Sequence, residues 1–420
     1  MTDLFWPGGY RAGELMTDRA LVAALVRVEL AWHGVLAAAG VAPAAKLPLP
    51  ADLGELSDAE LAELDRAAEE SGNPVIPLLS TLRSRLDHYD PEVAQWLHRG
   101  LTSQDVMDTA LVLLLREVLD ATWSEVARQS WALRELAQQH RGTLASGRTL
   151  TQHAVPITFG LMAATWLQGI LDAAEDLQRA RDHLSVQVGG AAGTLAAIAE
   201  LVGDSDPDPA GRAEALAADL AGALALRPAT PWHTNRRIVT RTGDALVAVT
   251  DAWGRVANDV LVRVRPELGE LSEGGDPSRG SSSTMPHKQN PVLSVQIRRA
   301  ALTAPGLGAS LHVAAAAQVD QRADGGWHAE WGALRTLARQ TVVAARQATE
   351  LIDNLVVHAD RIGWTARNAV DDLLAEQRSM RKLRGQAGEP TDPDGYLGAT
   401  DRLIDAAVRR ANLFLEQAER

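Results

Sequence analysis

Long stretches of this chain repeat apolar residues at helical spacing, and that feature constrains its fold more than any other. Residues 19–39 show it clearly, and it recurs in five further segments: 104–139, 156–185, 238–265, 290–303 and 330–358. Ala, Leu, Arg and Glu dominate and favour helix, whereas the alternating β-branched runs of strands are scarce. Several segments exceed the three or four turns of an average helix. The sequence therefore predicts an all-α fold with a central bundle of long helices.

The chain has 420 residues, which exceeds the usual length of one domain. Clusters of Pro, Gly and Asp mark the loops between the helical segments. From these loops we predict an N-terminal helical domain over 1–98, a central long-helix domain over 99–352 and a short C-terminal helical domain over 353–420.

The composition excludes several classes of function. The 41 basic and 54 acidic residues give a net charge of −13, and an acidic chain without a basic cluster is a poor binder of nucleic acid. The absence of cysteine excludes disulfides, thiolate catalysis, Cys-ligated zinc and iron–sulfur clusters. The 11 histidines show no metal-ligand spacing, and neither a phosphate-binding loop nor a dinucleotide fingerprint occurs. We expect neither a metal nor an organic cofactor.

Membrane insertion and secretion are not expected either. The uncharged windows 149–171 and 300–319 contain Pro, His and Gln, which suits helices buried on all sides in a large bundle better than spans of a bilayer. The first ten residues lack the basic start and apolar core of a secretory signal. Together with the missing cysteines, these features favour a cytoplasmic protein.

The segment 274–291, GGDPSRGSSSTMPHKQNP, is the most informative in the chain. A polar, glycine-rich loop of this length between two helices is uncommon without a function, and its prolines stiffen its second half. The chain contains only three lysines, and one of them, Lys288, stands in this loop. As a compact point charge, Lys288 suits the stabilisation of an oxyanion or of a neighbouring serine that gives up its proton.

A second polar segment, 98–109, reads HRGLTSQDVMDT. Thr102 and Asp105 fit a capping box, with a hydroxyl at the helix N-cap and an acid three residues later. Capping alone explains one hydroxyl. Adjacent Thr102 and Ser103 at a helix N-terminus, with His98 just before them, also suit the binding of a carboxylate. Both interpretations stay open at this point.

A third segment, 147–160, crowds polar residues before a helix whose first turn is expected to hold Pro156. Gln152 and His153 are the site candidates here. A lone histidine is usually structural, but one flanked by Arg, Thr and Gln ahead of a buried helix favours a functional site.

Two weaker candidates come from other polar segments. Arg236 belongs to PWHTNRR at a helix start, and Arg322 belongs to QRADGGWHAEW after a buried helix. The glycine-rich segment 187–194 suits close helix packing as well as it suits a ligand cradle.

Together these segments resemble the fumarase/aspartase superfamily over nearly the whole chain. The signature loop of that superfamily, G-S-S-x-M-P-x-K-x-N-P, matches from Ser282 to Pro291. The Met-Pro-His-Lys form resembles adenylosuccinate lyases and 3-carboxy-cis,cis-muconate cycloisomerases, and GLTSQDVMDTALVL, GRTLTQHAVPITFGL, PWHT and GGWHAEW resemble the cycloisomerase branch. Adenylosuccinate lyases carry Thr-His where this chain has Thr149 and Leu150, so their general-acid candidate is missing here.

The resemblance implies a homotetramer whose active sites are assembled from three chains, with no metal or organic cofactor. It also implies proton transfer at the carbon next to a carboxylate, with a di- or tricarboxylate as the small-molecule partner. By position, Ser282 is the base, and it is the proton donor in the reverse direction. The implied catalytic residues are Ser282, Lys288, His153 and His98. The implied substrate-binding residues are Thr102, Ser103, Gln152, Asn290, Arg236 and Arg322.

Three functional interpretations follow. The branch resemblance favours a 3-carboxy-cis,cis-muconate cycloisomerase, in which the substrate's own carboxylate adds to a double bond and gives 4-carboxymuconolactone in protocatechuate breakdown. An alternative is a lyase on the same scaffold that expels an amine, a nitro group or another substituent from a substituted succinate and leaves a fumarate-like acid. The third is a non-catalytic structural homologue, which the intact Ser282, Lys288 and Asn290 argue against.

Overall fold

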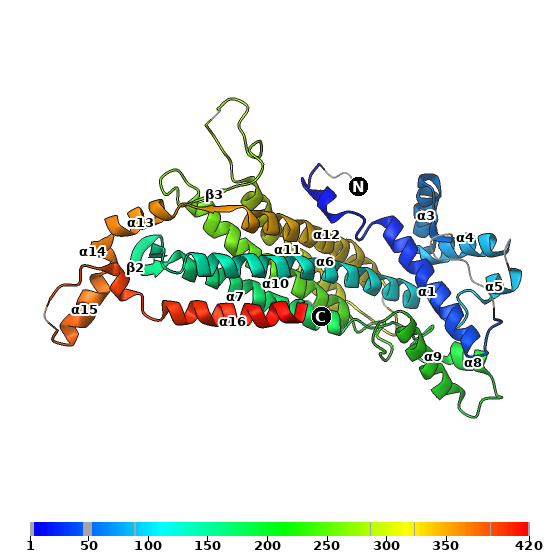
Figure 1. Ribbon diagram of the computed structural model, residues 1–420. Coiled ribbons are helices and arrows are strands. Elements are labelled where there is room, and N and C mark those ends of the chain that lie inside the picture. The colour runs from blue at the N-terminus through cyan, green and yellow to red at the C-terminus, as the bar shows by residue number, and fades with distance from the viewer. Residues whose placement is uncertain are drawn as a thin grey trace. The chain divides into compact units, whose positions relative to one another are not determined.

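A computed structural model describes residues 4–44, 53–87, 90–285, 287–322, 324–386 and 388–418, and most of them are helical (Figure 1). The chain forms two compact units, each assembled from three stretches of sequence. Unit 1 comprises Met1–Asp120, Gln178–Asp244 and Gly306–Arg339. Unit 2 comprises Ala121–Leu177, Ala245–Pro305 and Gln340–Arg420. The domain boundaries near 98 and 352 stay a prediction.

The predicted all-α class is confirmed, with two small antiparallel ribbons added to the helices. The helices are α1 (Asp18–Ala38), α3 (Asp58–Ser71), α4 (Val75–Asp87), α5 (Pro91–Trp96), α6 (Ser103–Gln139), α7 (Phe159–Asp182), α8 (Ala196–Val202), α9 (Pro209–Ala223), α10 (Arg237–Arg263), α11 (Val292–Ala316), α12 (Gly325–Asp353), α13 (Ala359–Asn368), α14 (Val370–Leu373), α15 (Ala375–Leu383) and α16 (Thr400–Ala418). The ribbons pair β1 (Leu144–Thr149) with β2 (Gln152–Thr158), and β3 (Leu271–Glu273) with β4 (Leu355–Val357).

The first ribbon corrects the sequence analysis at a place that matters for function. The predicted helix 156–185 begins only at Phe159, and Pro156 lies in β2 opposite Ser146 rather than in a first helical turn. Proline is tolerated there because each strand of a two-stranded ribbon has an unpaired edge. The window 149–171 therefore starts as a hairpin and not as a buried helix.

Helix α11 differs from the prediction in length and in burial. The predicted segment 290–303 covers only its first part, because the helix continues through Pro305 to Ala316. The expectation that 300–319 is buried on all sides is wrong for the single chain, since Leu302 and Val313 are 72% and 71% exposed. The helix thus presents an apolar face that this chain leaves uncovered.

Among the described residues, one helix, α1, is long and apolar enough to cross a membrane. Of that apolar window 61% is buried inside the protein, and Leu25, Trp32 and Leu36 are fully buried. The hydroxyl of Thr17 caps its first turn by accepting from the amide of Ala20. Burial of this kind is typical of the core helix of a globular unit.

Polar contacts fix the helices of unit 2 against one another. Helix α16 lies alongside α7 (Figure 1), where Arg410 pairs with Asp172 at 2.5 Å. The buried indole of Trp253 on α10 donates to Gln129 of α6, which in turn donates to Thr349 of α12. Buried side chains that are hydrogen-bonded in this way fix the register of three long helices.

Candidate active site

The N-terminal turn of α6, in unit 1, brings two predicted site residues together. Helix α6 begins at Ser103, and Thr102 precedes it. The hydroxyl of Thr102 accepts a hydrogen bond from the guanidinium of Arg322, which also donates to the carbonyl of Ala191 at 3.3 Å. A hydroxyl, a guanidinium and a helix N-terminus meet here, and each favours a bound carboxylate.

Asp105 supplies the acid half of the predicted capping box and also accepts hydrogen bonds from more distant residues. Its carboxylate accepts from the amide of Thr102 at 3.1 Å, as a cap requires. It also accepts from the side chains of Gln187 and His233 and from the amide of Gly189, at 2.9–3.0 Å. The glycine-rich segment 187–194 is therefore packed on a carboxylate of the protein itself.

Arg236 lies at the centre of a buried ion-pair network behind this turn. Its guanidinium donates two hydrogen bonds to Asp108, at 2.6 and 2.8 Å, and pairs with Glu330, and all three side chains are fully buried. The indole of Trp327 also donates to Asp108 at 2.9 Å. Because these carboxylates occupy the guanidinium, the geometry favours a supporting role for Arg236. Direct contact with substrate stays a prediction.

The same network raises the pKa of Glu330 to about 7. Burial is the main cause, and the negative charge of Asp108 adds to it, while Arg236 opposes it. Two carboxylates thus share one guanidinium in a site with no access to water. Burial alone would lower the pKa of Arg236, but the hydrogen bonds and negative charges of Asp108 and Glu330 together outweigh it and raise that pKa.

His98 lies on the loop before α6 and is paired with a residue the sequence analysis did not name. Its Nδ1 is 2.7 Å from Glu29 of α1, and both side chains are largely buried. The indole of Trp32, one turn away on α1, donates to the carbonyl of Arg99 at 2.7 Å. Helix α1 therefore holds the loop that leads into Thr102.

Gln152 and His153 begin strand β2, in unit 2, and both are exposed. The Nδ1 of His153 is 2.6 Å from the hydroxyl of Ser146, a buried residue of β1. Leu150 and Thr151 form the turn, with φ values of 48° and 75°. The hairpin thus presents the two predicted residues at its end while Ser146 holds the imidazole.

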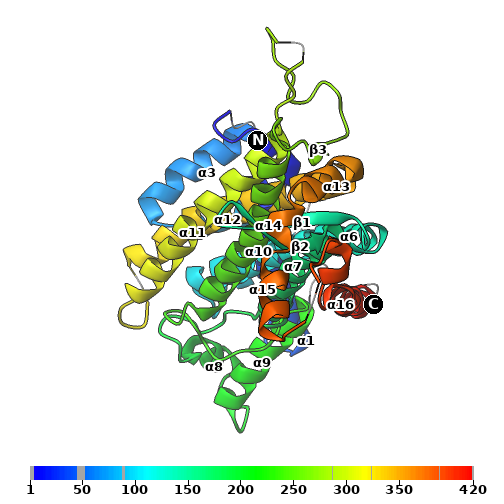
Figure 2. The ribbon, with the colours of Figure 1, turned by 90° about the vertical axis from the view of Figure 1, so that its left-hand side faces the viewer.

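Ser282 and Lys288 stand between β3 and α11, and both ribbon views show this segment of unit 2 projecting as a loop (Figures 1 and 2). We call residues 274–290 the serine loop. The Oγ of Ser282 accepts from the amides of Thr284 and Met285, at 3.4 and 3.2 Å. Donors of this kind favour an alkoxide over a neutral hydroxyl. Lys288 is exposed.

The neck of the serine loop is tightly closed. The amide and side-chain nitrogens of Asn290 both donate to the carbonyl of Gly280, at 2.9 and 2.8 Å. Gly280 has φ +73°, and a Cβ there would lie 2.1 Å from the carbonyl oxygen of Asn290, so the position requires glycine. Below the neck, Glu273 caps α11 by accepting from the amide of Ser294 at 2.8 Å. In this structure Asn290 closes the loop.

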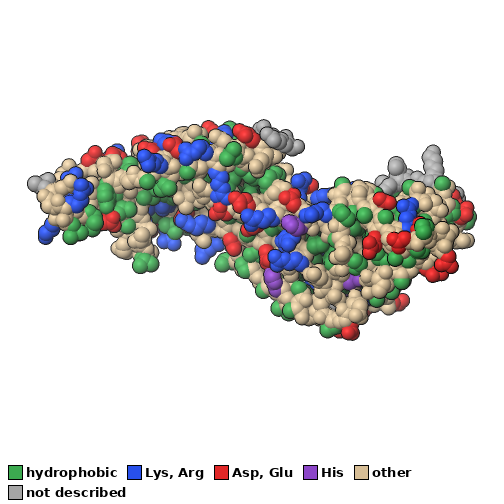
Figure 3. Space-filling view, turned by 90° about the horizontal axis from the view of Figure 1, so that it is seen from below, with side chains coloured by type: hydrophobic (Ala, Val, Ile, Leu, Met, Phe, Trp, Pro, Cys, Tyr) green, Lys and Arg blue, Asp and Glu red, His purple; other side chains and the backbone are tan. Residues whose placement is uncertain are grey.

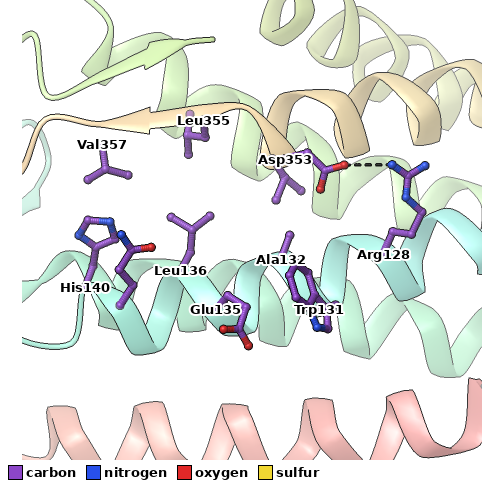
Figure 4. A pocket seen from close by; sticks show the side chains of 11 residues that line it. Arg128, Trp131, Ala132, Glu135, Leu136, His140, Asp353, Leu355 and Val357 are labelled. Atoms are coloured by element: carbon purple, nitrogen blue, oxygen red, sulfur yellow. Dashed lines mark hydrogen bonds and ion pairs between the residues drawn. The ribbon is translucent and has the colours of Figure 1, made fainter. Parts of the chain in front are cut away.

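The pocket shown in Figure 4 belongs to unit 2 but contains none of the predicted residues. It measures about 640 Å³ and lies between α6 and the segment that joins α12 to β4. Trp131 and Val357 line it, and Arg128 and Asp353 form an ion pair of 3.0 Å at one end. The predicted residues lie instead on the α6 turn of unit 1 and on the hairpin and the serine loop of unit 2.

Comparison with known proteins identifies the family. A family described as lyase matches residues 57–306. A nitrosuccinate lyase of Streptomyces davaonensis is 40% identical, over 94% of this chain and 91% of the relative. A 3-carboxy-cis,cis-muconate cycloisomerase of Bradyrhizobium diazoefficiens is 38% identical, over 94% and 83%. The chain belongs to the fumarase/aspartase superfamily.

Solved structures agree. The crystal structure of the 3-carboxy-cis,cis-muconate lactonizing enzyme from Pseudomonas putida aligns with a TM-score of 0.80 and 30% identity, and 96% of this chain and 97% of that chain are covered. The predicted superfamily and its fold are thereby confirmed, and the chain is an enzyme of lyase or cycloisomerase type.

Several residues that bond to the candidate site residues and hold them in place were not selected as candidates from the sequence. Asp105 was treated only as a cap, Glu330 was noted only as a member of the weak segment that holds Arg322, and Asp108, Glu29 and Ser146 were not considered. Their partners lie up to 219 residues away along the chain, so local spacing does not indicate most of these contacts. The one available signal was a run of polar residues inside otherwise apolar helical segments, since a buried polar side chain must have a partner.

Proposed function

We propose that the chain transfers a proton at the carbon next to a carboxylate, and that its substrate is 3-carboxy-cis,cis-muconate. The observation that carries the proposal is the serine loop, where the Oγ of Ser282 receives two backbone N–H donors and the exposed Lys288 follows on the same loop. The substrate is supported by the relatives and the solved structure that carry the cycloisomerase or lactonizing name.

In the lactonising direction the substrate's own carboxylate oxygen adds to a double bond. The hydroxyl of Ser282 gives its proton to the adjacent carbon, so one C–O bond and one C–H bond form as the C=C π bond is lost. Lys288 stabilises the charge that develops on the neighbouring carboxylate. The alkoxide left on Ser282 recovers a proton from solvent, and in the reverse direction it is the base.

The other predicted residues hold the carboxylates of the substrate. Thr102 and Arg322, which the structure brings together, bind one of them. Ser103, the first residue of α6, also contacts this carboxylate at the helix N-terminus. Gln152 and His153 line the site from the hairpin. We assign His98 and Asn290 to the site as well, and Arg236 supports it from behind.

We further propose a homotetramer with active sites shared between chains, in the cytoplasm. The apolar face of α11, with Leu302 and Val313 uncovered, supports an interface between copies. The serine loop projects from its own unit, which suits a site completed by another chain (Figure 2). Light scattering is expected to give about four times 44.9 kDa for the parent and a smaller mass for Leu302→Glu.

A second candidate is a lyase that releases nitrite from nitrosuccinate and leaves a fumarate-like acid. The specific observation in its favour is the 40% identical relative named nitrosuccinate lyase. Here the base removes a proton next to one carboxylate, and the C–N bond breaks as the double bond forms. The serine loop and the α6 turn serve both reactions.

One pair of assays separates the two. Ultraviolet absorption follows loss of the conjugated diene of 3-carboxy-cis,cis-muconate, and a colour reaction follows nitrite released from nitrosuccinate, with Ser282→Ala protein as the blank. Rapid diene loss with lactone formation is expected. Nitrite release without diene loss would overturn the cycloisomerase proposal and support the nitrosuccinate lyase. No reaction in either assay from tetrameric protein would overturn both.

A further inference from the structure

Asp105 gathers donors from three separate stretches of unit 1 onto one carboxylate. Besides the amide of Thr102 and the side chains of Gln187 and His233, its oxygens accept from the amides of Gly189 and Gly190 at 3.0 and 2.9 Å. The side chain is 1% exposed. A helix cap needs one such bond, and Asp105 has five.

These five groups dictate the chemistry of the side chain at position 105. All of them are N–H donors, and an ionised carboxylate is the small side chain that accepts at every lone pair. The N-terminus of α6 favours the negative charge. An asparagine here would turn its NH₂ group toward an N–H donor, so at least one contact would be lost.

The same carboxylate fixes the imidazole of His233. Its Nε2 donates to Asp105 at 2.9 Å, and its ring packs on the segment 187–194, which we call the glycine loop. A Cβ at Gly189 would lie 2.6 Å from Cε1 of His233, and one at Gly193 would lie 4.0 Å from Nδ1. The close approach of His233 therefore explains Gly189, whereas Gly190 and Gly193 are explained by their left-handed backbone, with φ values of +68° and +80°.

A closed circuit of contacts runs from Asp105 to the carboxylate-binding groups. Asp105 holds the amide of Gly190, the next residue, Ala191, accepts from Arg322, and Arg322 donates to the hydroxyl of Thr102. The amide of Thr102 returns to Asp105. Moving the glycine loop would therefore move the carbonyl that Arg322 contacts, and with it the guanidinium.

We propose that Asp105 is a positioning residue that sets the carboxylate-binding geometry of Thr102 and Arg322 through the glycine loop and His233. The assignment rests on the proposed function for the identity of the bound group, a carboxylate of the substrate. Asp105 itself does not touch the substrate. Its effect is on binding more than on proton transfer, because Ser282 and Lys288 stand on a different loop.

The test uses full-length tetrameric protein and two readouts. Asp105→Asn is expected to raise KM at least 30-fold and to lower kcat less than fivefold. By hydrogen exchange and mass spectrometry, peptides that cover 187–194 are expected to exchange at least tenfold faster. His233→Gln, which keeps an N–H donor toward Asp105, is expected to retain KM within fivefold of the parent, whereas His233→Phe is expected to follow Asp105→Asn.

Asp259→Asn is the matched control. The carboxylate of Asp259 accepts a hydrogen bond from the indole of Trp166 at 2.8 Å in unit 2. This variant therefore shows what the loss of a structural carboxylate does away from the glycine loop. Unchanged exchange of 187–194 in Asp105→Asn would overturn the proposal whatever the activity. Faster exchange with an unchanged KM would also overturn it. If the parent turns over neither substrate, the exchange result and the affinity for the dicarboxylate succinate decide the role of Asp105 separately from the proposed function.

Discussion

Asp105, Arg236 and most of their partners in unit 1 are buried and bonded to one another, whereas most polar side chains of the serine loop in unit 2 are exposed and Ser282 is half-buried. In the first region every donor of the Arg236 guanidinium has a carboxylate or carbonyl partner inside the protein. In the second, the described partners of Ser282 are nearby amides of its own loop, and Lys288 faces solvent.

This difference in burial indicates that the candidate residues of unit 1 are preorganised to a greater extent than those of the serine loop. The groups that we propose bind carboxylate are held by a buried network in the absence of substrate, so we expect binding to require little further ordering of the protein. The groups that we propose move the proton are presented on a loop whose neck is closed by Gly280 and Asn290 and whose remaining residues are mostly exposed. These groups depend on whatever covers the loop, which in our proposal is a second copy of the chain.

The largest expected effect comes from the exposed region. Ser282→Ala removes the proton carrier, so turnover is expected to fall at least 10³-fold while the oligomeric mass stays unchanged. Steady-state kinetics and light scattering measure the two quantities. Ser283→Ala, an exposed neighbour on the same loop, is the control and should keep activity within fivefold. Turnover of Ser282→Ala near that of the control would remove Ser282 from the mechanism.

The buried region should show its largest effect in stability. Arg236→Met leaves Asp108 and Glu330 without their shared cation, so the free energy of unfolding is expected to fall by about 3–5 kcal/mol. Denaturant titration measures it. Arg255→Met, which breaks a partly exposed pair with Asp259, should cost less than about 1 kcal/mol. Equal losses in both variants would mean that burial makes no difference to these pairs.

Glu330 makes the stability of the buried region depend on pH. Its folded pKa, about 7, exceeds the ordinary 4.5, so the folded state binds the extra proton between these values. Stability is therefore expected to fall as pH rises from about 4.5 to 7, by at most about 3 kcal/mol. Unfolding measured across that range on the parent and on Glu330→Gln tests this. The difference between the two proteins should change with pH, and a constant difference would contradict it.

A smaller effect sharpens the role of the exposed lysine. Lys288→Arg keeps the charge but replaces a compact ammonium by a planar fork, so kcat is expected to fall about 10- to 100-fold. Lys382→Arg, an exposed lysine on α15, is the matched control and should leave kcat unchanged. Full activity of Lys288→Arg would show that only a positive charge is needed on the serine loop.

The helices of both units could be predicted because their signal is local. Periodic apolar residues mark α1 and α6 nearly to their ends, and the signature of the serine loop is contiguous. The hairpin was missed because its apolar residues continue into the helical pattern of α7, and the proline at 156 also suits a helix start. The spacing of apolar residues alone does not distinguish a short strand from the start of a helix.

The organisation of the site was less accessible to sequence reasoning. Thr102 and Arg322 were both named, but their contact joins positions 220 residues apart. Arg236 was named for its charge, but in the folded chain that charge is buried and paired with Asp108 and Glu330. A residue type predicts what a side chain is able to do, whereas its partners are determined only by the folded chain.

The turn between β1 and β2 has a consequence for the engineering of this scaffold. Two successive left-handed residues suit Asn-Gly, yet the chain has Leu150 and Thr151 there, and Leu150 is 96% exposed. Each left-handed residue of this kind stores strain of about 1–3 kcal/mol. A thermostability screen would favour Asn-Gly at this turn, and in doing so would remove a bulky side chain next to Gln152. Heat resistance would then be gained at two positions that directly precede a residue of the candidate site.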